Sequence, residues 1–106
     1  MKEDELFTNL CQYACDILTF EERRSIPLNE WYEWVREHFT PIPKAELEVG
    51  KEYNGNCRNA SKATWDGEKF WYKRCKFGCT YDESINHYED DDPNEKFDVF
   101  VPIKEI

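Results

Sequence analysis

The chain has 106 residues, and its 23 acidic against 14 basic residues give a formal net charge of -9 at pH 7. This length predicts a single domain spanning residues 1–106. Aromatic residues make up 16% of the chain, enough large apolar surface to predict a folded core. The negative charge disfavours nucleic acid as a partner, and no stretch approaches the roughly 20 apolar residues of a membrane span.

The cysteines and the first residues bear on the cellular compartment. Five cysteines, an odd number, are typical of free thiols in a reducing environment. The opening residues MKEDE lack the apolar segment that a secretion signal requires. We therefore expect a cytoplasmic protein.

Residues 1–40 have the periodicity of helices. Thr19 and Glu22 have the spacing of a capping box, which predicts a short helix at residues 20–24. Pro27 favours a further helix start, and Pro41 ends that helix. The apolar stripe of the first helix contains Leu6, Phe7, Leu10, Cys11, Ala14, Ile17 and Leu18, and its polar face contains Glu3, Asn9, Gln12 and Asp16. The stripe that the last helix turns to the core contains Leu28, Trp31, Trp34, Val35, His38 and Phe39.

Residues 47–106 have the shorter period of strands, separated by turn residues. Asp66-Gly67 predicts a hairpin turn of type I′, and Asn54-Gly55 and Phe77-Gly78 also indicate turns. Pro102 predicts that the last strand, or its end, lies at a sheet edge. The expected strands are residues 60–65, 69–77, 80–86 and 97–103. The sequence therefore predicts an α+β fold, with an N-terminal helical hairpin packed on an antiparallel sheet of four to five short strands.

Acidic residues concentrate at residues 82–98, where eight carboxylates face a single lysine. Closely spaced carboxylates resemble a phosphate track and can occupy the basic groove of a nucleic-acid-handling protein. A solvated loop between two strands is the simpler interpretation of the same run. As the contact group for a protein partner with a basic surface we single out Glu83, Glu89, Asp90, Asp91, Asp92 and Glu95.

Basic residues concentrate at residues 58–76, with six cations against two carboxylates. Aromatic and basic residues alternate at 69–77, a combination that single-stranded nucleic-acid sites use for stacking and phosphate contact. The alternative interpretation is a strand with one aromatic face in the core and lysines at its solvent rim. For a nucleic-acid site the candidate residues are Arg58, Trp71, Lys73 and Arg74.

Cys75, Cys79 and His87 raise the alternative of a small zinc-supported module. Zinc sites usually show tighter pairs of cysteines, and no second pair accompanies this one. Small, half-buried thiols in a reduced protein are the simpler interpretation. The sequence contains no Gly-rich phosphate loop, G-x-S-x-G or H-E-x-x-H motif, so we expect neither an enzyme nor a cofactor.

The second half contains a series of short patterns, namely Leu47-x-x-Gly50-x-x-Tyr53, Cys57-Arg58-Asn59-Ala60, Ala63-x-Trp65-x-Gly67, Phe70-x-Tyr72-x-Arg74 and Asp98-Val99-Phe100-Val101-Pro102. In these patterns the chain resembles small accessory proteins encoded by tailed phages and prophages. The resemblance covers roughly half the chain and carries no catalytic signature. Because small acidic phage proteins often inhibit host machinery, including restriction and CRISPR systems, it implies an inhibitor acting in the host cytoplasm.

Taken together, the sequence predicts a non-enzymatic acidic binding protein with a basic protein partner. A homodimer is compatible with this prediction. The zinc module and the single-strand binder stay open as alternatives.

Overall fold

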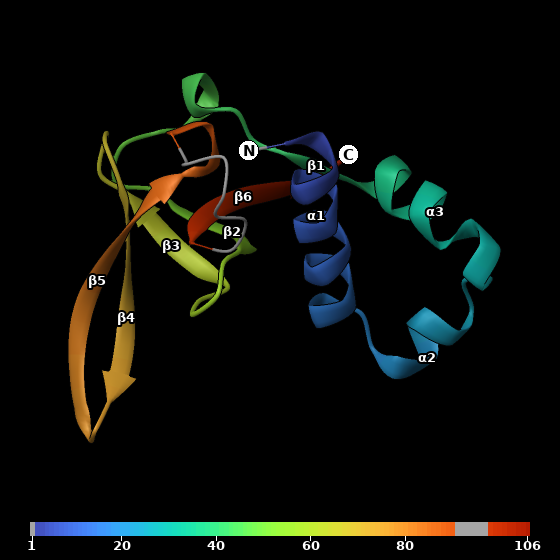
Figure 1. The fold of residues 1–106 in the computed structure, drawn as a ribbon, viewed down its shortest axis with the longest axis horizontal. Coiled ribbons are helices and arrows are strands. Elements are labelled where there is room, and N and C mark those ends of the chain that lie inside the picture. Colours follow the sequence, from blue (N-terminus) through green and yellow to red (C-terminus); the bar gives the residue numbers. More distant parts are fainter. Residues whose placement is uncertain (1, 91–97) are drawn as a thin grey trace.

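The computed structural model describes residues 2–90 and 98–106. Three helices come first: α1 (Glu3–Ile17), α2 (Phe20–Arg24) and α3 (Trp31–His38). Six strands follow: β1 (Phe39–Pro41), β2 (Glu52–Asn56), β3 (Lys62–Trp65), β4 (Phe70–Lys76), β5 (Cys79–His87) and β6 (Val99–Glu105). Short 3-10 turns are η1 (Leu28–Glu30), η2 (Lys44–Glu46) and η3 (Tyr88–Asp90). The predicted α+β fold is confirmed, with six strands in a mixed sheet (Figure 1).

Strand β6 closes the sheet into a barrel. The strand order is β1-β6-β2-β3-β4-β5, and β6 pairs additionally with β5. The β5–β6 pairing is parallel and joins His87 to Phe100, whereas all other pairings are antiparallel. Strands β2 to β6 therefore form a ring, which we call the barrel, and β1 extends it beside the helices. Closure removes most of the sheet edges that would otherwise attract another chain.

Two hydrophobic clusters lie on opposite faces of β6. Phe100 points into the barrel, whose interior also contains Ile42, Tyr53, Cys57, Ala63, Trp65, Phe70 and Tyr72. Neighbouring residues of β6 face the helices, because side chains alternate along a strand. This second cluster contains Leu10, Tyr13, Ala14, Val35, Phe39, Tyr88, Val99, Val101 and Ile103. Strand β6 is thus the shared wall between the barrel and the helices.

Strand β6 as a whole is not an edge strand, so that form of the prediction is wrong. Beyond Pro102 its described pairing is with β1 alone, which agrees with the other form, an edge at the end of the strand. Strand β6 is flanked by β2 on one side and by β5 and then β1 on the other. The carbonyl of Pro102 accepts a hydrogen bond from the Ile42 backbone N–H at 2.8 Å, so its backbone faces the β1 side. The missing N–H of Pro102 lies on the same side, in the interval between the end of β5, where His87 pairs with Phe100, and the end of β1, where Pro41 pairs with Ile103. A central strand tolerates proline there because no ladder hydrogen bond is lost.

Asn54 and Gly55 do not form a turn; both lie within β2. A Cβ atom on Gly55 would lie 2.1 Å from the carbonyl oxygen of Val101 and 2.8 Å from the ring of Phe100. Glycine is required here by the close approach of β2 to β6. The Asn-Gly pair, which resembles a turn in the sequence, therefore marks the place where β2 and β6 approach most closely.

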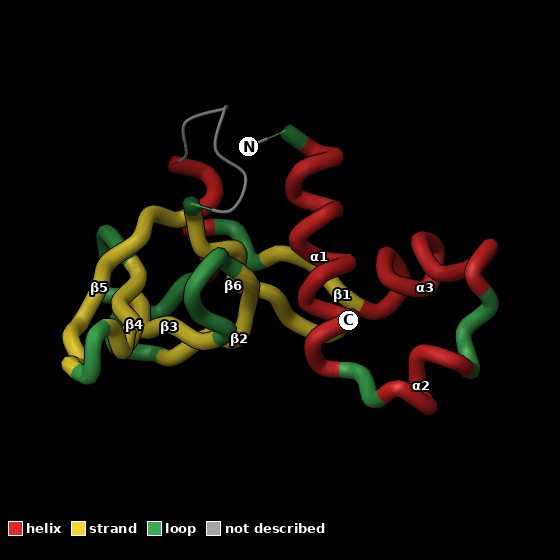
Figure 2. The backbone as a smooth tube through the Cα atoms, turned by 60° about the horizontal axis from the view of Figure 1, so that its bottom comes forward, coloured by secondary structure: helices red, strands yellow, loops and turns green. Residues whose placement is uncertain are grey.

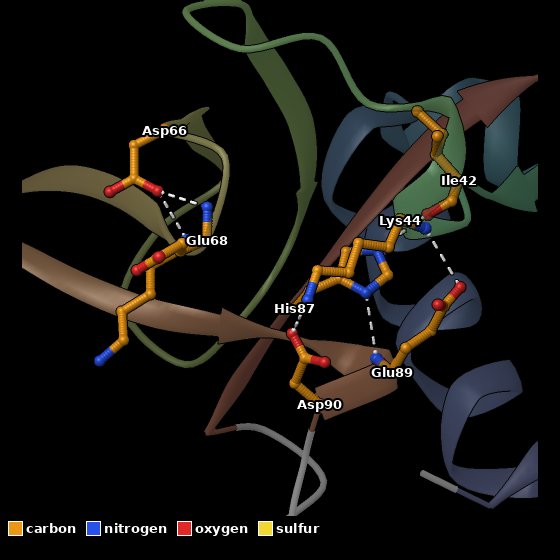
Figure 3. Close-up of polar contacts among 8 residues, drawn as sticks. Ile42, Lys44, Asp66, Glu68, His87, Glu89 and Asp90 are labelled. Atoms are coloured by element: carbon orange, nitrogen blue, oxygen red, sulfur yellow. Dashed lines mark hydrogen bonds and ion pairs between the residues drawn. The ribbon is translucent and has the colours of Figure 1, made fainter.

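The β3–β4 turn is real but longer than predicted. Trp65 pairs with Phe70, so the loop contains four residues instead of two. The Asp66 carboxylate accepts hydrogen bonds from the backbone N–H groups of Glu68 and Lys69, both at 2.7 Å (Figure 3). These bonds hold the pKa of Asp66 below its ordinary value. The aspartate thus organises the turn through its side chain.

Asn9 belongs to the core and not to the polar face of α1. It is fully buried, and its side-chain oxygen accepts a hydrogen bond from the amide of Asn56 at 2.7 Å. The amide of Asn9 donates to the Glu5 carbonyl at 2.9 Å. The sequence pattern groups Asn9 with the polar side chains of this helix, but a buried partner on β2 satisfies its amide oxygen.

The segment from Ile17 to Glu30, which we call the helical arm, contains α2 and η1 and extends away from the barrel (Figure 2). The predicted capping box is present, with hydrogen bonds between Thr19 and Glu22 in both directions. Neither α2 nor η1 buries a residue. Leu28, predicted to face the core, is 93% exposed, because η1 turns it outward before α3 begins.

Candidate functional site

Strands β4 and β5 form a long hairpin that projects from the barrel (Figure 1). They pair continuously from Phe70 with Ile85 to Lys76 with Cys79. Among the described residues, β4 pairs with a second strand only at Phe70 and Trp71. Residues 75–82 are all exposed. The outer half of the hairpin therefore presents its side chains without contributing to either core, and we treat it as the candidate site.

The end of the hairpin is a two-residue turn made of Phe77 and Gly78. Both residues have positive φ angles, 53° and 76°, the pattern of a type I′ turn. A left-handed conformation costs a residue with a Cβ atom roughly 1–2 kcal/mol. Phe77 is nevertheless 93% exposed, and its described neighbour is Lys76, whose Nζ lies 5.4 Å from the ring centroid. The position thus combines backbone strain with an aromatic side chain held in solvent, a combination associated with function.

The four candidates for nucleic-acid contact have carboxylate partners. Lys73 pairs with Asp82 at 2.8 Å, and the Trp71 ring N–H donates to Asp66 at 2.6 Å. The other two ion pairs join Arg58 to Asp98 and Arg74 to Glu83. The hairpin register sets Lys73 and Arg74 of β4 beside Asp82 and Glu83 of β5, so these charges neutralise one another in pairs. This arrangement leaves these cations less available to phosphates than the sequence alone suggests.

Glu83 is held within the hairpin by its neighbours. Its carboxylate accepts a hydrogen bond from the Tyr72 hydroxyl at 2.5 Å and from Arg74 at 3.2 Å. The pKa of Glu83 is lowered by the hydrogen bond from Tyr72 and, to a smaller extent, by that from Arg74. Burial and this hydrogen bond raise the pKa of Tyr72 to about 12. Glu83 therefore stabilises the base of the hairpin.

Glu89 and Asp90 hold the segment that follows β1. The Glu89 carboxylate accepts a hydrogen bond from the Lys44 backbone N–H at 3.1 Å (Figure 3). The Lys44 ammonium pairs with Asp90 at 2.8 Å. The other members of the predicted acidic contact group, Asp91, Asp92 and Glu95, lie outside the described residues.

His87 is a buried structural residue at the base of β5. Its Nε2 lies 3.0 Å from the Ile42 carbonyl, and its Nδ1 accepts a hydrogen bond from the Glu89 backbone N–H at 3.1 Å (Figure 3). The second bond requires Nδ1 to be unprotonated, so Nε2 carries the proton and donates. Burial holds the pKa of His87 below its ordinary value. The imidazole is thus kept neutral between β1 and η3.

The three candidate zinc ligands are not brought together. Cys75 pairs with Thr80, whereas Cys79 pairs with Lys76, so the two cysteines point to opposite faces of the hairpin. Cys79 and His87 are the two ends of β5, eight residue steps and roughly 26 Å apart along the extended strand. Within residues 2–90 and 98–106, no group of three or more potential ligands is placed to hold a metal ion.

The predicted turn at Phe77-Gly78 is present, but the sequence pattern also counts Phe77 in the strand at residues 69–77 and does not mark its ring as exposed. Leu28, expected in the core stripe, is exposed as well. For Leu28 the signal is its position directly after Pro27, outside the regular helix. Trp31 and Trp34 pack against the helical core but remain half-buried.

The comparisons with known proteins add no relative: no protein-family model, curated protein or solved structure matches the chain. Within the part of the chain that the structure describes, no helix is long and apolar enough to cross a membrane.

Proposed function

We propose that the chain is a non-enzymatic binding protein that engages a protein partner through the end of the β4–β5 hairpin. The observation that carries this proposal is Phe77, an aromatic side chain 93% exposed at the end of a projecting element. Aromatic residues supply much of the binding energy in protein interfaces when a partner pocket encloses them. Lys76 beside it would meet a carboxylate or a backbone carbonyl at the rim of that pocket.

The acidic surface supports a partner whose remaining surface is basic. A net charge of -9 speeds the approach of a basic protein and repels nucleic acid. Because Glu83, Glu89 and Asp90 already have intramolecular partners, we assign the anchoring contact to Phe77 instead. The acidic contact group acts in this proposal through long-range attraction.

The narrower role, a phage-encoded inhibitor of a host defence or nucleic-acid-handling protein in the cytoplasm, is one form of such binding. It rests on the resemblance of residues 47–102 to phage accessory proteins. Metal analysis and oligonucleotide binding at low salt test the zinc and single-strand alternatives. Against them stand the separation of Cys75 from Cys79 and the ion pairs of the hairpin.

The test of the proposal is affinity capture from a bacterial lysate with the wild-type chain and the variant F77N. Asparagine tolerates positive φ, so F77N removes the ring while keeping or improving the turn. We expect a retained protein that wild type captures and F77N loses. The matched control is V49N, because Val49 is a 72% exposed apolar residue outside the hairpin. Equal capture by wild type and F77N would refute the hairpin proposal.

A further inference from the structure

The helical arm carries a second exposed apolar surface, independent of the hairpin. Its groove has a volume of about 500 Å³, and the large apolar side chains that line it are Phe20, Ile26, Leu28 and Trp31. Leu28 is 93% exposed and Phe20 is 66% exposed. A volume of this size admits a few large side chains. The exposed apolar surface indicates a contact that the isolated chain leaves unmade.

The arm is shaped by local signals and not by burial. Thr19 and Glu22 close a complete capping box, and Pro27 precedes η1. Neither α2 nor η1 contributes a buried residue. A ligand can therefore enter the groove without displacing any part of either hydrophobic core.

The charge of the groove is positive at contact distance. Phe20, Arg23 and Arg24 have the spacing i, i+3, i+4, so they share one face of α2, and all three line the groove. The Arg24 guanidinium lies over the ring of Phe20, with its Cζ 5.7 Å from the ring centroid. No described carboxylate lines the groove. Within residues 2–90 and 98–106, neither arginine takes part in an ion pair.

The carboxylates of α2 do not cancel this positive charge inside the groove. Glu22 accepts a hydrogen bond from the Thr19 backbone N–H at 3.2 Å, which commits it to the cap. Glu21 is exposed and does not line the groove. The Debye length is about 10 Å at 0.1 M salt, so the acidic residues of the distant barrel have little effect here. The two arginines therefore select the ligand at contact range, although the whole chain is acidic.

We propose that this groove binds an acidic, apolar peptide segment of a partner protein. Large apolar side chains of the segment enter between Phe20 and Leu28, and two of its carboxylates meet Arg23 and Arg24. An arginine suits this contact because its planar guanidinium donates two parallel hydrogen bonds to one carboxylate. An amphipathic helix with apolar residues on one face and acidic residues beside them has this chemistry.

Two other occupants match the groove less well. A second copy of the same groove would set arginines against arginines. A nucleic acid would satisfy the arginines with phosphates but would leave the aliphatic side chains of Ile26 and Leu28 unmatched. An acidic, apolar peptide matches both the charge and the apolar surface.

This site goes beyond the proposed function and does not depend on it. The arm and the β4–β5 hairpin lie at opposite ends of the molecule in Figure 1. The hairpin presents Phe77 to a partner with a basic surface, whereas the arm selects an acidic segment. The chain would then connect two proteins of opposite charge.

The test is selection of binders to the wild-type chain from a yeast-displayed library of random peptides about 16 residues long, four to five turns if helical. Each enriched peptide is then synthesised, and its Kd is measured by fluorescence anisotropy. We expect peptides that combine large apolar residues with Asp or Glu. They should bind the double variant R23Q, R24Q, and separately L28N, at least about tenfold more weakly than wild type.

The matched control is the double variant K62Q, K69Q, which removes two exposed positive charges that do not line the groove. We expect its Kd to stay within about twofold of wild type. The inference is overturned if no enriched peptide depends on Arg23 and Arg24, or if the peptides that do so lack carboxylates.

A second control separates this site from the hairpin. The variant F77N should bind the arginine-dependent peptides as wild type does, and circular dichroism checks that every variant is folded. A loss in F77N equal to that in R23Q, R24Q would place the peptide on the hairpin and overturn the inference. None of these outcomes depends on a partner captured through Phe77, so the two proposals fail separately.

Discussion

At the scale of single residues, Gly55 is where the barrel leaves no room for a side chain. In the variant G55A, the added methyl group meets a backbone carbonyl, which cannot rotate away as a flexible side chain would. We expect the free energy of unfolding to fall by about 3 kcal/mol or more. The measurement is chemical denaturation at neutral pH.

The control for G55A is G50A. Gly50 has a φ angle of 85° but open space around its Cα, so alanine there meets only backbone strain. We expect G50A to cost roughly 1 kcal/mol. Equal losses for the two variants would contradict the close crossing of β2 and β6.

The lowered pKa of His87 should make the stability of the protein depend on pH. Burial lowers its pKa in the folded state, so the unfolded chain binds more protons below its ordinary pKa of about 6.5. Above that pH, His87 therefore makes its full contribution to the free energy of unfolding. As the pH falls towards the folded-state pKa this contribution is lost, by at most about 1.4 kcal/mol per pH unit. Nearby Glu89 and Asp90 oppose this shift, and Lys44 adds to it.

The measurement is the free energy of unfolding between about pH 7 and pH 5.5, where carboxylates with ordinary or lowered pKa values stay largely ionised. We expect stability to fall with pH in wild type and in H38Q, and the slope to flatten in H87Q. A slope unchanged by H87Q would show that His87 does not control this transition.

At the scale of elements, the Thr19 cap should stabilise α2 itself but contribute little to the free energy of unfolding of the whole protein. In T19A the cap is lost, which costs about 1 kcal/mol of local helix stability. Because α2 buries no residue, we expect faster hydrogen exchange in residues 20–25 but a change in global unfolding below about 0.5 kcal/mol. A large fall in global stability would mean that the arm contributes to the core after all.

The elements that the sequence predicted well are those with local signals. Helix α2 begins and ends where the capping box places it, and β4 and β5 match the predicted strands within one residue at every end. Strand β2 was missed because Asn54-Gly55 resembles a turn. The tertiary reason for Gly55, its approach to Val101, has no local signature.

At the scale of the whole molecule, the α+β class was predictable and the closure of the barrel was not. Closure depends on β6 pairing with three strands from distant parts of the sequence. The candidate site shows the same limit. The basic and acidic blocks were visible in the sequence, but only the hairpin register reveals that they pair, as Lys73 does with Asp82. Charge counted by segment therefore overstated how many cations of the hairpin are available to phosphates.

We place the anchor for a protein partner at Phe77. Titration calorimetry measures the affinity of the captured partner for wild type and for F77N. An enclosed aromatic anchor contributes about 2 kcal/mol or more, so we expect a Kd at least about 30 times weaker for F77N, with unfolding stability equal to or above that of wild type. Equal affinities for the two proteins would contradict the claim and move the binding site away from the hairpin.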